Sequence, residues 1–374
     1  MRVVHISTIH RALDVRIFYK ECKTLAAAGN EVHLIISSPP SDRVDGVFFH
    51  PVDRTLNANR IQRTWRRLSS AYQQAISLKS ELYHFHDPEL IPIGILLKLT
   101  GARVIYDVHE DSPQEAMSLN KGRPLQGWIR FWIWTVLEGL AKRVLDAFVC
   151  VTPTIAQNFP EKKTILVHNY PLLEELLLVN ESTVPYCARN PNIAYVGGIS
   201  AIRAIREMVS AMEHLPTTVE AKMVLVGEFS PPELKAEVEQ MSGWERVEFM
   251  GWQSRSIVIQ QLAQARLGLV LFHPERDHIE ALPNKLFEYM AAGLPIVASD
   301  FPLWREIIES LGCGLLVDPL DPRAIAQAIQ YLLEHPDLAE AMGKRGQEAV
   351  QTKYNWNSEA KKLLELYSSL LSAR

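Results

Sequence analysis

A short segment of the sequence places two carboxylates and a lysine around a predicted helix start. In "HIEALPNKLFEYMAAGLPIVASD", residues 278–300, Glu280 precedes "PNK" and Glu288 follows it. Pro283 suits the first turn of a helix, because its missing N–H group would have no partner there. The free amides of such a start and the Lys285 ammonium favour an anion such as a phosphate. A capped surface helix with scattered charges is the alternative interpretation.

Each group in this segment predicts a different contact with a phosphorylated ligand. The amides of Asn284, Lys285 and Leu286 would point at a phosphate oxygen. Glu288 lies about one turn further along the helix, where it would accept hydrogen bonds from a neutral diol such as a ribose. Glu280, in the loop before the helix, would accept from sugar hydroxyls.

A second phosphate-binding feature follows the predicted strand "NIAYVGG", which ends at Gly197 and Gly198. Glycines let the backbone approach a phosphate, and a helix begins a few residues later. Arg203 and Arg206 lie near that helix start, and Arg203 is close enough to bind the same anion through two N–H groups. A tight turn without a ligand is the alternative. The remaining nucleotide-binding candidates end the next two predicted strands and are Gly227 and Trp252.

Polar side chains also follow two strands predicted in the first half of the chain. They come from "YHFHDPEL" and "YDVHED" and are His84, His86, Asp87, Glu89, Asp107, His109, Glu110 and Asp111. The carboxyl ends of adjacent parallel strands meet at one edge of a sheet, so these groups are expected to come together. Histidine and carboxylate are metal ligands, but no cysteine and no fixed helical histidine spacing supports a metal, and none is expected. Asp14 and Arg16 are expected to form a structural ion pair or to help hold an acceptor.

The elements that must position these residues alternate between strands and helices. Short apolar runs separated by helical patterns predict parallel βαβ units. The strands expected in the first half are 2–7, 31–37, 81–86, 103–109 and 147–152, with a helix over 15–29 that ends at Gly29. Those of the second half are 192–198, 221–228, 247–252, 267–273, 295–299 and 313–319. Its helices are 204–215, 231–241, 256–265, 322–334 and 336–354, besides the one at "PNK".

A chain of 374 residues is too long for one compact core. The proline-rich, polar segment 168–192 separates two α/β domains, each a doubly wound, Rossmann-like sheet. We place them at residues 1–175 and 176–354, with a C-terminal helix near 355–374 packing back on the first. Ligands of such sheets bind beyond the carboxyl ends of the strands, so we expect them in a cleft between domains that face each other.

The composition is that of a globular protein, with 47% hydrophobic and 22% charged residues. The first residues, "MRVVHIS", predict a buried strand rather than a signal peptide, and no stretch is apolar enough for a membrane span. Four cysteines without metal or redox spacing predict reduced, buried thiols in a cytoplasmic protein. Residues 1–175 carry 21 basic and 18 acidic side chains and the rest 18 and 25. Such an asymmetry indicates different partners for the two halves, unless it is chance variation.

Two segments of the first half combine basic and aromatic residues. Segment 54–79 has several arginines, Trp65 and no acid, and segment 121–143 is rich in tryptophan. Such helices suit an anionic membrane surface or a lipid-linked acceptor on the inner face of a membrane. A buried core face is the alternative for the second segment. Nucleic acid is not expected, because the net charge is −4 and no nucleic-acid motif is present.

The same motifs resemble a known family. "EALPNKLFEYMAAGLPIVASD" is similar to the donor-site signature of family 4 glycosyltransferases of the GT-B fold, in which two glutamates are separated by seven residues. "YVGGISAIRAIREM" resembles the family's glycine turn and its basic residue. "HRALDVRIFYKECKTLAAAGNEVHLI", "YHFHDPEL" and "VIYDVHED" resemble one subgroup of that family, so the similarity covers nearly the whole chain.

This resemblance implies retaining, metal-independent transfer of a sugar from a nucleotide-sugar, here a UDP- or GDP-sugar, to a saccharide or lipid-linked acceptor in envelope or exopolysaccharide synthesis. It implies a diphosphate clamp of Arg203 and Lys285, with Glu288 at the ribose and Glu280 at the donor sugar. It places His109 near the donor sugar and acceptor, where an imidazole donates a hydrogen bond or relays a proton. No other cofactor is implied.

Two positions depart from the family pattern. Gly198 stands where many members have an arginine, so Arg203 or Arg206 must compensate. The first glutamate is followed by Ala281, Leu282 and Pro283 rather than by a glycine-rich loop. Two other functions stay open, namely a sugar-nucleotide epimerase and, because of Gly198, a non-catalytic partner subunit.

Overall fold

The computed structural model describes residues 1–52, 59–118, 124–172 and 184–372. The chain forms two compact units, Met1–Asn169 with Asn357–Arg374, and Tyr170–Trp356. The boundary predicted between residues 175 and 176 lies outside the described residues. The last helix belongs to the first unit, so the chain returns to the unit in which it began.

The first unit contains a sheet of eight strands in the order β3-β4-β2-β1-β5-β6-β7-β8. All neighbours are parallel except β3 and β4. The five predicted strands are confirmed, whereas β3, β4 and β8 were not predicted. The strands are β1 (Arg2–Ile6), β2 (Glu31–Ile36), β3 (Arg43–Val44), β4 (Val47–Pro51), β5 (Leu82–Phe85), β6 (Arg103–Val108), β7 (Ala147–Cys150) and β8 (Thr164–Leu166).

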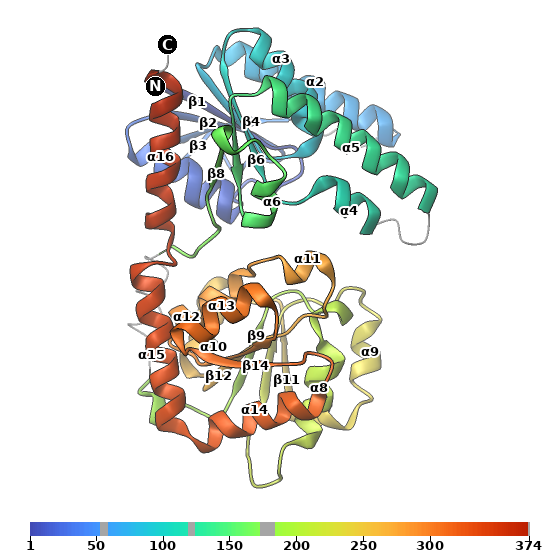
Figure 1. Cartoon of the computed structure of the whole chain (residues 1–374), viewed down its shortest axis with the longest axis vertical. Helices are drawn as coiled ribbons and strands as arrows, with labels where there is room; N and C mark the ends of the chain where they lie inside the picture. The colour runs from blue at the N-terminus through green and yellow to red at the C-terminus, as the bar shows by residue number, and fades with distance from the viewer. Residues whose placement is uncertain (53–58, 119–123, 173–183, 373–374) are drawn as a thin grey trace. The chain divides into compact units, whose positions relative to one another are not determined.

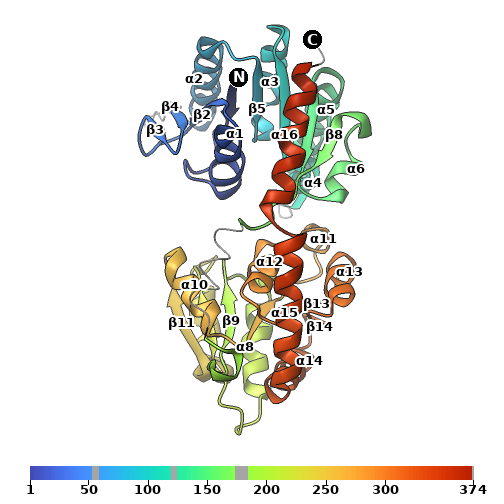
Figure 2. The ribbon, with the colours of Figure 1, turned by 90° about the vertical axis from the view of Figure 1, so that its left-hand side faces the viewer.

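Helices cover both faces of this sheet, with α2, α3 and α5 on one and α1 and α16 on the other (Figures 1 and 2). The predicted helix 15–29 begins as a π-helix, η1, and continues as α1. The helical elements are η1 (Val15–Cys22), α1 (Lys23–Ala27), α2 (Arg60–Leu78), η2 (Pro88–Leu90), α3 (Ile91–Leu99), α4 (Ser112–Ser118), α5 (Pro124–Val144), α6 (Pro153–Gln157), η3 (Glu161–Lys163) and α16 (Trp356–Ser372).

The second unit contains six parallel strands in the order β11-β10-β9-β12-β13-β14. Counted along the chain this is 3-2-1-4-5-6, the order of Rossmann-type sheets. All six were predicted from their apolar runs. They are β9 (Ile193–Val196), β10 (Met223–Val226), β11 (Val247–Gly251), β12 (Leu267–Val270), β13 (Ile296–Ser299) and β14 (Gly314–Val317).

Two hydrophobic cores lie on the two faces of the second sheet. One is built with α8 and α14, and the other with α10, α12, α13 and α15. Helix α13 was not predicted. The helical elements are η4 (Tyr186–Ala188), η5 (Ala201–Arg203), α8 (Ile205–His214), α9 (Leu234–Val238), η6 (Ser242–Arg246), α10 (Arg255–Gln264), α11 (Arg276–Ile279), α12 (Asn284–Ala291), α13 (Pro302–Leu311), α14 (Pro322–Glu334) and α15 (Pro336–Thr352).

The strand orders fix where each unit has its topological switch point. In the first sheet the order reverses between β1 and β5, and in the second between β9 and β12. Connections leave the carboxyl ends of these strand pairs in opposite directions, which opens a crevice suited to ligands. Some of the polar residues singled out from the sequence lie there, among them His86 directly after β5 and Lys285 beside Gly197 at the end of β9.

Candidate active site

Helix α12 is tied to the switch point of the second sheet by Tyr289. The Tyr289 hydroxyl accepts a hydrogen bond of 2.7 Å from the amide of Val196, the last residue of β9. Its ring lies against Gly268 in β12, where a Cβ atom would come within 2.3 Å of the ring. Gly268 therefore makes room for Tyr289, and Tyr289 holds the start of α12 beside the end of β9.

Lys285, one turn before Tyr289, is buried at this switch point. Its ammonium lies 3.8 Å from the centre of the Tyr195 ring. Among the described residues it has no hydrogen-bond partner. Burial, and next the charge of Arg203, hold the pKa of Lys285 well below its usual value. A buried cation without an anion is costly, and a phosphate ligand would remove that cost.

Gly197 and Gly198 provide the space that the two cations occupy. A Cβ atom on Gly197 would lie 3.4 Å from the Lys285 Nζ atom, and one on Gly198 would lie 2.3 Å from Arg203 Nη1. Arg203 Nη1 donates to the Gly198 carbonyl oxygen at 3.0 Å. The guanidinium of Arg203 thus fills the space that a Gly198 side chain would take. Its contact with a donor phosphate stays a prediction.

Arg206 does not take part in this arrangement, contrary to the alternative that it compensates for Gly198. Its Nη2 atom donates to Glu237 Oε2 at 2.7 Å on the surface, and this pairing raises the pKa of Arg206. Between Arg203 and Arg206 the backbone turns at Ala204, a buried residue with a φ of 54°. This left-handed turn separates the directions of the two arginines.

The two glutamates flank the helix start as expected, but each has a partner that the sequence did not reveal. Glu288 Oε1 lies 2.9 Å from Arg255 Nη1, at the first residue of α10. Glu280 directly follows the unpredicted short helix α11, and its Oε1 atom lies 3.4 Å from Arg276 Nε. Both carboxylates keep part of their surface exposed. Their roles at the ribose and the donor sugar stay predictions.

The details of the helix start differ from the prediction at two residues. Pro283 precedes the first residue of α12 in extended conformation rather than standing in its first turn. The amide of Leu286 donates to the Pro283 carbonyl oxygen at 3.0 Å. This leaves the amides of Asn284 and Lys285 as the candidates for a phosphate oxygen.

The last two nucleotide-binding candidates differ in burial. Gly227 has a φ of 152°, and a Cβ atom there would lie 1.9 Å from the Gly197 carbonyl oxygen. Because Gly227 has no side chain, the backbone of the Gly197 turn can pack directly against it. Trp252 follows β11 with 68% of its surface exposed, and a role in stacking on a base stays a prediction.

At the carboxyl ends of the first sheet, Asp107 in β6 forms the centre of a buried cluster. Arg16 Nε and Nη2 donate to its two oxygens, each at 2.9 Å. His86 Nδ1 and His109 Nε2 lie 3.2 and 3.1 Å from Asp107 Oδ2. Burial opposes ionisation, but Arg16 and the imidazoles hold the pKa of Asp107 well below its usual value. Asp107 thus orients His109, whose side chain is 22% exposed.

Asp14 does not form the expected ion pair with Arg16. Its carboxylate caps η1 by accepting hydrogen bonds from the amides of Arg16 and Ile17, at 2.8 and 2.9 Å. The Arg16 guanidinium pairs with Asp107 instead.

Asp87 braces the loop that follows β1. Its carboxylate accepts from the amides of Thr8 and Ile9 and lies 2.9 Å from His10 Nδ1. Glu89 accepts from the Thr8 hydroxyl at 2.8 Å. Sequence reasoning missed His10, although its ring lies 5.2 Å from that of His109.

The predicted cluster of eight polar residues forms only in part. His86, Asp87, Asp107 and His109 come together, whereas Glu110 is exposed and Asp111 caps α4 by accepting from the Gln114 amide at 3.1 Å. His84 lies deeper, where its Nδ1 atom is 2.7 Å from the Tyr367 hydroxyl of α16.

Two family models match this chain. Residues 15–169 match "Glycosyltransferase Family 4", and residues 188–349 match "Glycosyl transferases group 1". Together they span most of the chain, which belongs to the family 4 glycosyltransferases with the GT-B fold.

Relatives and solved structures agree with this assignment. The chain is 24% identical over 369 residues to N-acetyl-alpha-D-glucosaminyl L-malate synthase of Bacillus anthracis, covering 93% of this chain and 90% of that one. It is 24% identical to a D-rhamnosyltransferase of Pseudomonas aeruginosa, with the same coverage. Sucrose-phosphate synthase of Thermosynechococcus elongatus shares the fold with a TM-score of 0.76 at 19% identity, over 100% of both chains. HepE of Anabaena, solved with UDP-glucose, shares the fold with a TM-score of 0.74 at 14% identity. The match covers 99% of this chain and 100% of that one.

The protein is therefore a glycosyltransferase that uses a nucleotide-sugar, and the epimerase alternative is set aside. Among the described residues, no helix is both long and apolar enough to cross a bilayer. The four cysteines are unpaired, but Cys187 is exposed, so the expectation that all are buried was wrong for it.

Proposed function

We propose that the protein is a retaining glycosyltransferase whose donor diphosphate is neutralised by Arg203 and Lys285 without a metal ion. The observation that carries this proposal is the Lys285 ammonium, which is buried and has no hydrogen-bond partner among the described residues. A nucleoside diphosphate would give it one, and the guanidinium of Arg203 lies close enough to lower its pKa. With two cations at the leaving group, a divalent ion is not needed there.

In this reaction the bond between the sugar anomeric carbon and the diphosphate oxygen breaks, and the acceptor oxygen bonds to the same carbon. Arg203, Lys285 and the amides at the start of α12 stabilise the charge that develops on the leaving oxygen. Front-side attack retains the configuration, and the leaving phosphate takes the acceptor proton. His109, oriented by Asp107, would donate a hydrogen bond or relay a proton at the sugar.

The acceptor is proposed to be a saccharide or a lipid-linked sugar held by the first unit, with the protein at the cytoplasmic face of a membrane. Helix α5 supports this, because its exposed apolar residues recur every three or four positions and share one face. They are Leu125, Trp128, Ile129, Trp132, Ile133, Val136 and Leu140. A soluble protein rarely exposes such a stripe without a partner. Residues 121–123 and 54–58 of the two predicted membrane segments lie outside the described residues.

Arginines of α2 would add an attraction for anionic lipid. Arg63 and Arg66 are exposed. Arg67 instead donates to the Thr8 carbonyl oxygen at 3.4 Å and lies 3.8 Å from Glu89, so it is not part of this surface.

The reaction is tested by incubating the protein with UDP- and GDP-sugars and measuring nucleoside diphosphate release without added Mg²⁺ or Mn²⁺. We expect slow hydrolysis of one donor, and an α-linked donor should give an α-configured product by NMR. Inversion of the anomeric centre would contradict retention, and an absolute requirement for added metal would contradict the two-cation clamp.

Membrane contact is tested by flotation with vesicles containing anionic lipid. Changing Trp128 and Trp132 to Gln should reduce binding, whereas changing the exposed Trp252 of the other unit to Gln should not. Equal flotation of both variants, or self-association through α5 in its place, would contradict the membrane proposal.

A further inference from the structure

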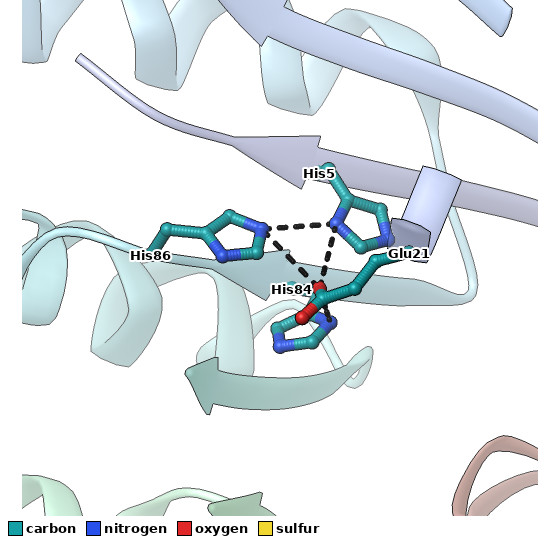
Figure 3. Close-up of side chains that lie close together, drawn as sticks. All are labelled: His5, Glu21, His84 and His86. Atoms are coloured by element: carbon teal, nitrogen blue, oxygen red, sulfur yellow. Dashed lines mark hydrogen bonds and ion pairs between the residues drawn. The ribbon is translucent and has the colours of Figure 1, made fainter. Parts of the chain in front are cut away.

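Four buried side chains of the first unit converge on one point (Figure 3). They are His5 in β1, His84 in β5, His86 directly after β5, and Glu21 in η1. Their side chains have no exposed surface. Glu21 Oε2 lies 3.9 Å from a nitrogen of each imidazole, namely His5 Nδ1, His84 Nδ1 and His86 Nε2.

The sheet register explains why these residues meet. Strands β1 and β5 are parallel neighbours, and His5 is paired with His84. Residues two apart in a strand point to the same face, so His86 joins them. Glu21 reaches this face from η1, whose π-helical turn is wider than that of an α-helix.

Glu21 lies beside the charged Arg16 and Asp107, but its carboxylate oxygens accept no hydrogen bond within the described part of the chain. Arg16 Nε lies 3.1 Å from Oε1 without hydrogen-bond geometry. The separation of 3.9 Å from each imidazole nitrogen is too long for a hydrogen bond. The four candidate ligand atoms lie within 4.8 Å of one another, and two of them, His5 Nδ1 and His86 Nε2, are 3.0 Å apart in a hydrogen bond. Two ligand atoms bound to one Zn²⁺ lie about 3.3–3.6 Å apart. A bound ion would therefore replace that hydrogen bond and draw the more distant atoms about an ångström closer.

The outer contacts of the imidazoles are those that metal ligands need. His86 Nδ1 is 3.2 Å from Asp107 Oδ2, which leaves Nε2 facing Glu21. His5 Nε2 is 3.1 Å from the Tyr367 hydroxyl, which leaves Nδ1 facing inward. Such second contacts fix the tautomer and ring orientation of a ligating histidine. His84 Nδ1 also contacts Tyr367, at 2.7 Å, and would exchange that contact for the metal.

We propose that His5, Glu21, His84 and His86 bind one divalent transition-metal ion of the Zn²⁺ type. Three imidazoles and one carboxylate suit Zn²⁺ better than Mg²⁺ or Ca²⁺, which prefer oxygen ligands. Four protein ligands in a fully buried site leave no position for substrate, so the ion is structural. It joins η1, β1 and β5, and through Tyr367 it stabilises α16.

This site is separate from the proposed phosphate clamp, since its ligands belong to the first unit and Lys285 and Arg203 to the second. The proposal of metal-independent transfer concerns the diphosphate alone. Loss of the ion should lower the stability of the first unit while leaving nucleotide binding unchanged.

The test is the metal content and Zn²⁺ affinity of the whole protein, prepared without a histidine tag. We expect one Zn²⁺ per chain by mass spectrometry, and tight rebinding after demetallation in competition with a chelator. Glu21→Gln should weaken binding at least about 100-fold. His33→Gln is the matched control, because His33 in β2 also contacts a histidine and a glutamate, His50 at 2.8 Å and Glu31 at 3.0 Å. It should bind Zn²⁺ like the wild type.

Two further measurements apply if Glu21→Gln does not fold. Tyr367→Phe keeps all four ligands and should retain one Zn²⁺ with about 10-fold lower affinity. Co²⁺ in the wild-type protein should give the intense visible absorption of tetrahedral coordination. No Zn²⁺ binding by the wild type, octahedral Co²⁺, or equal affinity in a folded Glu21→Gln variant would overturn the proposal and leave a metal-free, hydrogen-bonded cluster.

Discussion

Arg16 and Lys285 are both buried cations near the carboxyl ends of a parallel sheet, but their surroundings differ. Arg16 donates to both oxygens of Asp107 and, through Nη1, to the Val167 carbonyl oxygen at 3.0 Å. Lys285 faces the rings of Tyr195 and Phe272, and its ammonium has no hydrogen-bond partner in the part of the chain that the structure describes. A buried charge that the protein satisfies serves structure and orientation, whereas one left unsatisfied indicates a ligand that brings the opposite charge.

The largest expected effect on stability comes from removing Asp107, the carboxylate to which Arg16 donates. Asp107→Asn should lower the free energy of unfolding by about 3–5 kcal/mol, because it removes the carboxylate that accepts two hydrogen bonds from the buried guanidinium. Denaturant unfolding measures this change. Asp300→Asn, which removes the surface partner of Arg305, is the control and should have little effect. An Asp107→Asn variant as stable as the wild type would contradict the claim that Arg16, unlike Lys285, is stabilised by a partner within the protein.

Removing the charge of Lys285 should not lower the free energy of unfolding, in contrast to Asp107→Asn. Lys285→Met should leave the free energy of unfolding unchanged or raise it by about 1 kcal/mol, because no partner is lost. The pKa of Lys285 is lowered in the folded protein, so the unfolded chain binds the additional proton. Stability should therefore rise with pH between the folded and the unfolded pKa.

Unfolding curves of both proteins across that pH range measure this contribution. The difference between Lys285→Met and the wild type should shrink as the pH rises. A difference that does not change with pH would show that Lys285 is not a strained cation.

A smaller effect is expected at Gly198. In Gly198→Ala the new Cβ would come within 2.3 Å of Arg203 Nη1, and the flexible guanidinium would move aside at little cost to stability. One charge-assisted contact to the diphosphate would weaken, which lowers the affinity for UDP or GDP about tenfold. Calorimetric titration measures it, and an unchanged affinity would mean that Arg203 does not contact the nucleotide.

The smallest effect is expected at Arg206, which shares the sequence neighbourhood of Arg203 but pairs with Glu237 on the surface. Arg206→Ala should change nucleotide affinity by less than about threefold, because exposed ion pairs contribute little. A loss of nucleotide affinity as large as that of Arg203→Ala would show that Arg206 also binds the diphosphate.

The sequence predicted the fold well where apolar runs were long. All six strands of the second sheet and five of the first were predicted, because buried parallel strands are nearly continuous apolar runs. Strand β4 was missed because its "VFFHP" ends in proline. No element was predicted over α13, which lies between the predicted strands 295–299 and 313–319.

The candidate site was predicted less completely, because sequence spacing does not show which partners meet across the fold. The helix start at "PNK" carried a recognisable signal in Lys285 and its neighbours. By contrast, the pairing of Glu288 with Arg255 joins two separate helices, and Lys285 of α12 is covered by Tyr195 of β9. His5 and Glu21 carried no signal, since His5 meets His84 through the strand register and Glu21 reaches both from η1.

The measurement that tests the central claim most directly is calorimetric titration of UDP and GDP in buffers of different ionisation enthalpy. We predict that the wild type binds one nucleotide with uptake of protons above the lowered pKa of Lys285, because the diphosphate restores its ammonium form. Lys285→Met should bind at least about 100-fold more weakly and without that uptake. Binding of equal affinity by a folded Lys285→Met variant would contradict the claim that this buried cation awaits the donor diphosphate.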